Sequence, residues 1–335
     1  MFFTRKINAL LAVFDLQIVR KSVLYGWQTG EVATPQDLSL PDGAQEYLQV
    51  NNPRLQELRQ RYSHFQAQAS IPIVWTDEYV QSYGLQSFRG DNCYVWQTRD
   101  PNCAEINYCL TAYYVKAIDK LGLLEKNNED GLFGVHTHTV DSKLVSRDFL
   151  DSILELHFLE EHLLLSQLPE LNIVDIGAGY GRLAYRTATS FPNLSTYLCT
   201  DGVPESTFLS EYHINFRQLE EKVAVVPLDE IEQRLQKKQI DLAINIHSFS
   251  ECSLEAIEWW LSLLAAAHVR YLFIVPNASD HGGEKLALNG GEDFSYLVEK
   301  YGYELRSKAP KYSDPLVQKF GVSPTYYYLY QLTDS

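Results

Sequence analysis

Three closely spaced glycines that follow an apolar run limit most strongly what this chain can fold into. The apolar run covers residues 171–176, and residues 183–188 after the glycines are typical of a helix. The glycines are Gly177, Gly179 and Gly181. Because glycine has no Cβ, the backbone can turn tightly here and approach a ligand closely. The order of strand, glycine turn and helix therefore predicts a nucleotide-type site at the end of a parallel strand.

The spacing of the glycines separates two classes of cofactor. A dinucleotide fingerprint, G-x-G-x-x-G, requires glycine at the position of Arg182. The pattern here is D-x-G-x-G-x-G from Asp175 onwards, and it resembles motif I of class I S-adenosylmethionine (SAM) methyltransferases. Asp201 ends the next β-prone run, where an acidic side chain can accept hydrogen bonds from ribose hydroxyls. These signals favour SAM over NAD as the cofactor, with Asp175, the glycines, Arg182 and Asp201 in its binding site.

Apolar runs alternate with helical patterns through the second half of the chain. Strands are expected at residues 172–176, 196–200, 223–227, 240–246 and 270–275, with helices at 181–190, 205–220, 229–237 and 253–267. A further helix is expected at 294–301, and a closing pair of strands at 303–308 and 326–332. This alternation predicts a parallel sheet with helices on both faces. The expected fold class is α/β, a Rossmann-like sheet of seven strands with the last one antiparallel, as in class I methyltransferases.

The chain is expected to divide near residue 145. Residues 1–145 carry mixed signals and are interpreted as a mainly helical cap that covers the active site and shapes the substrate pocket. Residues 146–335 are interpreted as a SAM-dependent methyltransferase domain. Further helices are expected at residues 55–65, at 107–124 and, capped by Ser146, from there to about Gln167.

The N-terminus has an amphipathic pattern. Its apolar residues fall on one helical face: Phe3, Ile7, Leu10, Leu11, Phe14 and Ile18. We expect this helix to pack on the body of the protein, and attachment to a membrane surface is the alternative. No run of the sequence is long and apolar enough to span a bilayer.

Composition narrows the classes of function. The net charge of -15 argues against a nucleic-acid substrate, because proteins that bind nucleic acids normally need a basic face. The five cysteines are scattered without a C-x-x-C pair, so neither a zinc cluster nor a disulfide framework is expected. Reduced thiols in a cytoplasmic protein are the simplest interpretation.

Residues that follow the later strands are candidates for ligand contacts, because ligands bind outside the carboxyl ends of the strands in such sheets. Asp229 could accept a hydrogen bond from an adenine amino group, or it could cap the next helix, and the sequence does not decide between the two. Asn245, near the end of the fourth strand, is also assigned to the cofactor site.

Two histidines and one glutamate are candidates for catalysis. His247 could act as a general base for a hydroxyl group, since the histidine pKa lies near neutral pH. Glu251 could orient His247 or bind substrate hydroxyls, and His281 is a second candidate base. Alternatively, His247 is a hydrogen-bonded residue of a tight turn, and His281 is a solvated residue of a loop, and neither takes part in catalysis.

Four motifs make the resemblance more specific. They are V-S-R-D-F-L-D-S-I-L-E at 145–155, G-A-G-Y-G-R at 177–182, D-G-V-P-E-S at 201–206 and N-I-H-S-F-S-E at 245–251. Over about residues 105–280 the chain resembles a family of proposed sugar O-methyltransferases. Cys252, where the family more often has methionine, and Gly202, which loosens the turn after Asp201, depart from the family pattern.

The resemblance implies a SAM-dependent O-methyltransferase. Its acceptor would be a hydroxyl of a sugar or of a glycosylated or natural-product small molecule, methylated by in-line displacement with help from a general base. A polyketide-like or phenolic hydroxyl is the alternative acceptor. A nucleotide-dependent oxidoreductase of Rossmann type is the alternative enzyme class.

A divalent metal could hold vicinal hydroxyls, as in some sugar methyltransferases, but the sequence does not indicate one. His247 with Glu251, or His281 with Asp280, could supply part of such a site. His136 and His138 would point the same way on a strand, yet no carboxylate partner is identifiable. We therefore expect a structural or acceptor-pocket role for this pair and no metal ligands.

Overall fold

The computed structural model describes residues 39–71, 74–75, 84–90, 101–278 and 281–333. The amphipathic helix expected near the N-terminus lies outside the described residues.

Seven strands form the central sheet. They are β3 (Leu171–Ile176), β4 (Leu194–Thr200), β5 (Val223–Val225), β6 (Leu242–Ile246), β7 (Tyr271–Val275), β8 (Tyr303–Pro310) and β9 (Tyr326–Leu332). Their order is β5-β4-β3-β6-β7-β9-β8. The pairs from β5 to β7 are parallel, and β9 runs antiparallel to both β7 and β8. The predicted fold class, a Rossmann-like seven-stranded sheet with an antiparallel last strand, is confirmed.

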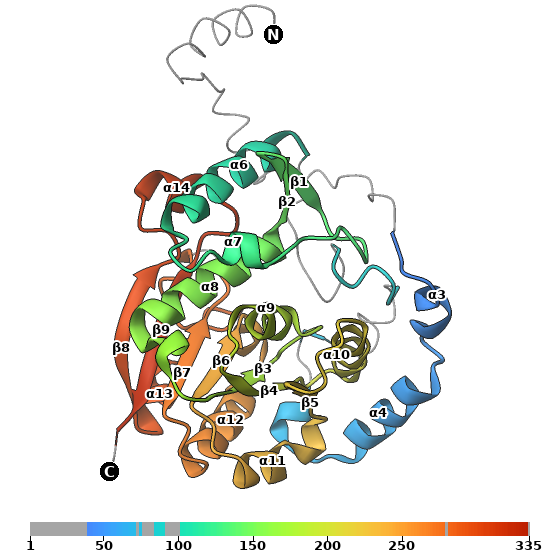
Figure 1. Ribbon diagram of the computed structural model, residues 1–335. Helices are drawn as coiled ribbons and strands as arrows, with labels where there is room; N and C mark the ends of the chain where they lie inside the picture. The colour runs from blue at the N-terminus through green and yellow to red at the C-terminus, as the bar shows by residue number, and fades with distance from the viewer. Residues whose placement is uncertain (1–38, 72–73, 76–83, 91–100, 279–280, 334–335) are drawn as a thin grey trace, which may run out of the picture.

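Helices cover both faces of this sheet (Figure 1). They include α8 (Arg147–Leu163), α9 (Arg182–Ser190), α10 (Pro204–Phe216), α11 (Ile231–Lys237), α12 (Leu254–Ala266) and α13 (Ser295–Lys300). In Figure 1, α8 and α9 lie above the sheet, and α12 and α13 lie below it. Each helix matches a predicted one to within a few residues, except that the segment before α11 is a separate 3-10 turn, η5 (Leu228–Glu230).

The alternation of side chains along β3 explains the two-sided core. All six residues of the strand are buried. Ile173 belongs to the cluster that contains α8 and α9 side chains, whereas Val174 and Ile176 belong to the cluster that contains α12 and α13 side chains. Because successive residues of a strand point to opposite faces, a continuous apolar run is what a doubly covered parallel strand requires.

The region before α8 contributes α3 (Ala44–Tyr47), α4 (Pro53–His64), η3 (Gln68–Ser70), α6 (Pro101–Ile118), α7 (Leu123–Lys126) and a hairpin of β1 (Thr137–Val140) and β2 (Lys143–Ser146). The helix predicted over 107–124 was wrong at its C-terminal end. Gly122, with a φ of 65°, separates α6 from α7 in a left-handed conformation. The short 3-10 turn η4 (Leu165–Gln167) follows α8, and α14 (Pro315–Phe320) lies between β8 and β9.

The expected division at residue 145 falls inside β2. Tyr108 and Val140 from the region before it share one apolar cluster with Phe149 of α8 and Ile173 of β3. The two-domain interpretation stays a prediction, and in the described residues the two parts share a core.

Ser146 caps α8 as the sequence predicts. Its Oγ accepts a hydrogen bond from the backbone N–H of Phe149 at 3.1 Å and donates to the buried Glu129 carboxylate at 2.5 Å. Ser253 caps α12 in the same way, by accepting from Ala256 N–H at 3.1 Å, and no carboxylate contact is recorded for it in the described part of the chain.

We expect Ser146→Ala to lower the free energy of unfolding by about 1–3 kcal/mol, because it removes a helix cap and a hydrogen bond to a buried carboxylate. The matched variant Ser253→Ala removes only a cap and should cost about 1 kcal/mol. Urea unfolding of both variants measures the difference. Equal losses would contradict the added role of the Glu129 contact.

Candidate functional site

The parallel strands end together at one edge of the sheet. Ile176 is in register with Thr200 of β4 and with Asn245 of β6, and Ile246 is in register with Val275 of β7. The residues that follow these strands therefore meet at the carboxyl edge, which is where such sheets bind ligands.

The glycine turn lies at this edge and has little room for side chains at two of its positions. The N–H groups of Gly177 and Ala178 both donate to the carbonyl of Thr200, at 2.9 and 3.1 Å. Gly177 has a φ of +73°, and a Cβ on it would lie 2.2 Å from the Ser248 hydroxyl oxygen. A Cβ on Gly179 would meet no atom within 4 Å, so the backbone is open there on the ligand side. The turn ends at Gly181, which precedes α9 with a φ of +79°.

A cavity of about 900 Å³ opens over this turn. Its walls come from the glycine turn, the residues after β4, β6 and β7, the first turn of α8, and the segment after η3. Among the lining residues are Ile71, Trp75, Arg147, Asp151, Asp175, Gly179, Arg182, Asp201, His247, Glu251, Asn277 and Thr325. The volume lies at the upper end of the range for small-molecule sites.

Three buried carboxylates line one part of the cavity. Asp201 accepts hydrogen bonds from Gly179 N–H at 3.0 Å and Val203 N–H at 2.9 Å, and Asp175 accepts one from the Tyr197 hydroxyl at 2.8 Å. Burial raises the pKa of Asp175 to about 7 and that of Asp201 to about 7, and it also raises the pKa of Glu251. Asp201 and Glu251 lie close enough for their negative charges to repel each other. None of the three has a salt bridge within the described residues. Arg182 lies close enough for its charge to lower the pKa of Asp175, but its guanidinium is paired with Glu155.

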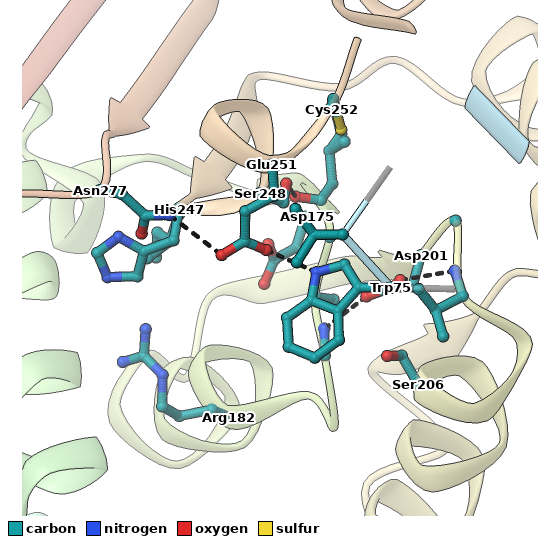
Figure 2. A pocket seen from close by; sticks show the side chains of 18 of the residues that line it. Trp75, Asp175, Arg182, Asp201, Ser206, His247, Ser248, Glu251, Cys252 and Asn277 are labelled. Atoms are coloured by element: carbon teal, nitrogen blue, oxygen red, sulfur yellow. Dashed lines mark hydrogen bonds between the residues drawn. The ribbon is translucent and has the colours of Figure 1, made fainter. Parts of the chain in front are cut away.

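Glu251 connects two segments that are far apart in the sequence. Trp75 Nε1 donates to its carboxylate at 2.6 Å, and Asn277 Nδ2 donates to it at 3.1 Å (Figure 2). The contact fixes an aromatic side chain from the N-terminal region on the cavity wall. The sequence shows an aromatic-rich region, but nothing in it indicates this pairing.

His247 occupies the turn directly after β6. Its backbone has a φ of 68°, and its N–H donates to the carbonyl of Val275 at 2.7 Å. The ring lies against the cavity, and its buried Nδ1 has no hydrogen-bond partner in the described part of the chain. Burial, followed by the positive charge of Arg147, lowers the pKa of His247 to about 3. The imidazole is therefore neutral at pH 7. In the ligand-free protein it is a weaker base than the near-neutral pKa assumed from the sequence implies.

Asn245 has a structural role that corrects its assignment to the cofactor site. Its Nδ2 donates to the Ile176 carbonyl at 3.0 Å and to the Ser248 hydroxyl at 2.5 Å, and its Oδ1 accepts from Phe249 N–H at 3.0 Å. With these contacts the side chain holds the turn after β6, and it does not line the cavity.

Asp229 lies outside the cavity lining and points to another partner. Its carboxylate forms a two-bond contact with the guanidinium of Arg61, at 2.9 and 2.7 Å. The interpretation as a helix cap was also wrong, since Pro227 precedes η5, Glu230 precedes α11, and neither turn has a side-chain cap.

Arg182 and His281 also have partners within the protein. Arg182 lines the cavity, but its guanidinium donates to both oxygens of Glu155 at 2.8 and 3.0 Å and to the Ser152 hydroxyl at 2.8 Å. His281 does not line the cavity, and its Nδ1 accepts from Gly283 N–H at 3.2 Å. The structure brings Asp175, Gly177, Gly179, Arg182, Asp201, His247 and Glu251 together around the cavity and leaves the other candidates aside.

Neither a metal cluster nor a membrane helix is found in the described residues. They contain no group of three or more histidine, cysteine, aspartate or glutamate side chains arranged to hold a metal ion. None of the helices in the described ranges is long and apolar enough to cross a membrane.

Comparison with known proteins finds only distant likeness. No protein-family model matches the chain, and no curated protein matches it. A SAM-dependent methyltransferase from Aquifex aeolicus has 16% identity, covers 52% of this chain and 89% of its own, and has a TM-score of 0.39. Magnesium protoporphyrin IX methyltransferase from Synechocystis PCC 6803, described with bound SAM, has 13% identity, coverage of 67% and 97%, and a TM-score of 0.40. The cyclase SpnF has 12% identity, coverage of 70% and 96%, and a TM-score of 0.42. Likeness at this level carries no argument about this chain.

We expect Asp175→Asn to stabilise the ligand-free protein in a pH-dependent way. The pKa of Asp175 is raised from 3.8 to about 7 on folding, so its ionisation disfavours the folded state as the pH rises through this range. The amide cannot ionise and keeps an oxygen for the Tyr197 hydroxyl. The gain in melting temperature should be largest above pH 7 and should vanish near pH 4.

Thermal unfolding between pH 4 and pH 8 measures this gain. Asp42→Asn, in the exposed turn before α3, is the control for removal of one surface carboxylate. A difference between Asp175→Asn and the wild type that stays constant with pH would contradict the burial of an uncompensated charge.

Proposed function

We propose that this protein transfers a methyl group from SAM to a hydroxyl group of a small molecule. The observation that carries the proposal is the group of three carboxylates at the carboxyl edge of the sheet, none of which forms a salt bridge within the described residues. SAM has a sulfonium, an ammonium and one carboxylate, so its net charge is positive. NAD carries two phosphates and a negative net charge, which this wall would repel.

The same wall offers the contacts that a nucleoside needs. Each oxygen of Asp201 accepts one backbone N–H and keeps a second lone pair for a ribose hydroxyl. The open backbone at Gly179 permits close approach, and the N-terminus of α9 favours the carboxylate of the methionine part. Asp175 holds Tyr197 behind the turn and adds negative charge nearby.

The remainder of the cavity would hold the acceptor. Its lining includes His247, Trp75 and Asn277, which offer a proton acceptor, an aromatic face and an amide. An aromatic face fits a sugar ring and also a flat phenolic ring. We infer a sugar or a glycosylated small molecule as the acceptor, in line with the sequence motifs, and a phenolic or polyketide-like hydroxyl is the second candidate.

His247 is our candidate for the general base. As the bond between the acceptor oxygen and the methyl carbon forms and the bond from that carbon to sulfur breaks, the hydroxyl proton would pass to the neutral imidazole. S-adenosylhomocysteine (SAH) would leave with the bonding electron pair. The positioning of the two ligands in one cavity supplies a further part of the rate enhancement.

Calorimetric titration with SAM, SAH and NAD tests the proposed function. We expect binding of SAM and SAH and no binding of NAD under the same conditions. Binding of NAD alone would favour the oxidoreductase alternative, and failure of SAM and SAH to bind would overturn the proposal.

We expect His247→Ala to reduce methyl transfer by about 10²-fold or more while SAM affinity changes little, because a general base acts on the acceptor proton. His281→Ala is the matched control, since His281 does not line the cavity, and its turnover should equal that of the wild type. Release of SAH, measured over time with an active acceptor, gives the rates. Normal turnover in His247→Ala would exclude it as the base.

A further inference from the structure

The first turn of α8 places an arginine on the wall of the cavity. Arg147 lines the cavity with 16% of its side chain exposed, and its Nε donates to Asp151 at 3.2 Å. Its two terminal nitrogens have no hydrogen-bond partner among the residues that the structure describes. A guanidinium normally uses these two nitrogens together, to bind a carboxylate or a phosphate through parallel hydrogen bonds.

The charges around Arg147 do not balance. Asp151 is shared, because its other oxygen accepts from the ammonium of Lys311 at 2.5 Å. That ammonium also donates to the carbonyls of Val322 and Ser323, each at 3.0 Å, so all of its donors are used. Two cations thus face one carboxylate, and the surplus positive charge lies at the open end of Arg147.

The other charged side chains described near Arg147 form salt bridges of their own, so none of them pairs with its terminal nitrogens. Arg182 is paired with Glu155. Asp148, the other acid of this turn, is near enough to raise the pKa of Arg147, but it accepts from the Tyr180 hydroxyl and its salt bridge is to Arg89. That salt bridge belongs to a network that contains equal numbers of acids and bases: Glu129, Asp130 and Asp148 with Arg89, Arg186 and Arg217.

We infer that the acceptor carries an anionic group, a carboxylate or a phosphate, which Arg147 binds inside the cavity. The inference rests on the proposed methyl transfer and names the class of its substrate. The cavity then has two polarities, with a negative wall for the sulfonium donor and a positive point for the acceptor. Acidic sugars, such as uronic acids or sugar phosphates, fit this arrangement, whereas neutral sugars offer no anion to the terminal nitrogens of Arg147.

The same contact would act on His247. The charge of Arg147 is the largest cause, after burial, of the low pKa of this histidine. An anion bound to Arg147 would offset that charge and raise the pKa of His247, so the base would be strengthened when the acceptor is present.

Binding of simple probes tests the inference without knowledge of the natural acceptor. D-glucuronate, D-glucose 6-phosphate and D-glucose are titrated by ligand-observed NMR into the protein, with and without saturating SAH. The proteins are the wild type, Arg147→Gln, Arg147→Lys and Arg234→Gln, a control at an exposed position with 53% of the side chain accessible. SAH affinity and melting temperature are measured for each variant to show that the fold is intact.

We expect the wild type and Arg234→Gln to bind at least one anionic probe more tightly than glucose. Arg147→Gln should weaken that binding by about tenfold or more, and Arg147→Lys should restore part of it. Glucuronate and glucose 6-phosphate distinguish a carboxylate from a phosphate. The inference is overturned if glucose binds as well as both anions, if Arg147→Gln binds them like the wild type, or if neither anion binds.

Failure of SAH to bind would count against the proposed function, whereas the anion titration without SAH still decides the role of Arg147.

Discussion

Burial of negative charge at the carboxyl edge of the sheet is the constraint on which the site depends. Asp175, Asp201 and Glu251 are each largely removed from water and accept hydrogen bonds from neutral donors, so ionisation of each carboxyl costs stability. Their hydrogen bonds also fix the walls, since Asp201 holds the glycine turn and Glu251 holds Trp75. A cationic ligand would offset this cost, and the free protein is in that sense prepared for one.

Helix α8 connects the site to the rest of the molecule through acids on one of its faces. Asp148, Asp151 and Glu155 follow one another at intervals of three and four residues, which places them on one side of the helix. They bind a tyrosine of the glycine turn, the lysine after β8, and the arginine that begins α9, respectively. The V-S-R-D motif is therefore explained by these contacts: its serine caps the helix, its aspartate holds the glycine turn, and its arginine faces the cavity.

The fold could be predicted from the sequence because its signals are local. Continuous apolar runs followed by glycine or acidic residues set the strands, and caps such as Ser146 set the helices. The hairpin of β1 and β2 was missed, since its turn uses Asp141 and Ser142 with φ values of 48° and 65° and has no glycine. The end of α6 was missed because Gly122 was read as part of the helix.

The site was less predictable, because partners far apart in the chain decide what a side chain does. Asp175 lies near the end of β3, and Asp201, His247 and Glu251 follow strands, so all four could be placed at the sheet edge from the strand pattern alone. Asp229 was a candidate for an adenine contact or a helix cap, yet Arg61, 168 residues away, binds its carboxylate. The surplus charge of Arg147 likewise depends on Lys311, which is 160 residues from Asp151. No periodicity or motif shows such pairings.

The measurement that tests the central claim most directly is the affinity of SAM relative to SAH between pH 5.5 and pH 7.5. The two ligands differ by the positively charged sulfonium, whereas they share the nucleoside and the amino acid part. If the carboxylate wall recognises that charge, the preference for SAM should grow as the pH rises and Asp175 and Asp201, each with a pKa of about 7, lose their protons. An affinity ratio that stays constant over this range would contradict the account.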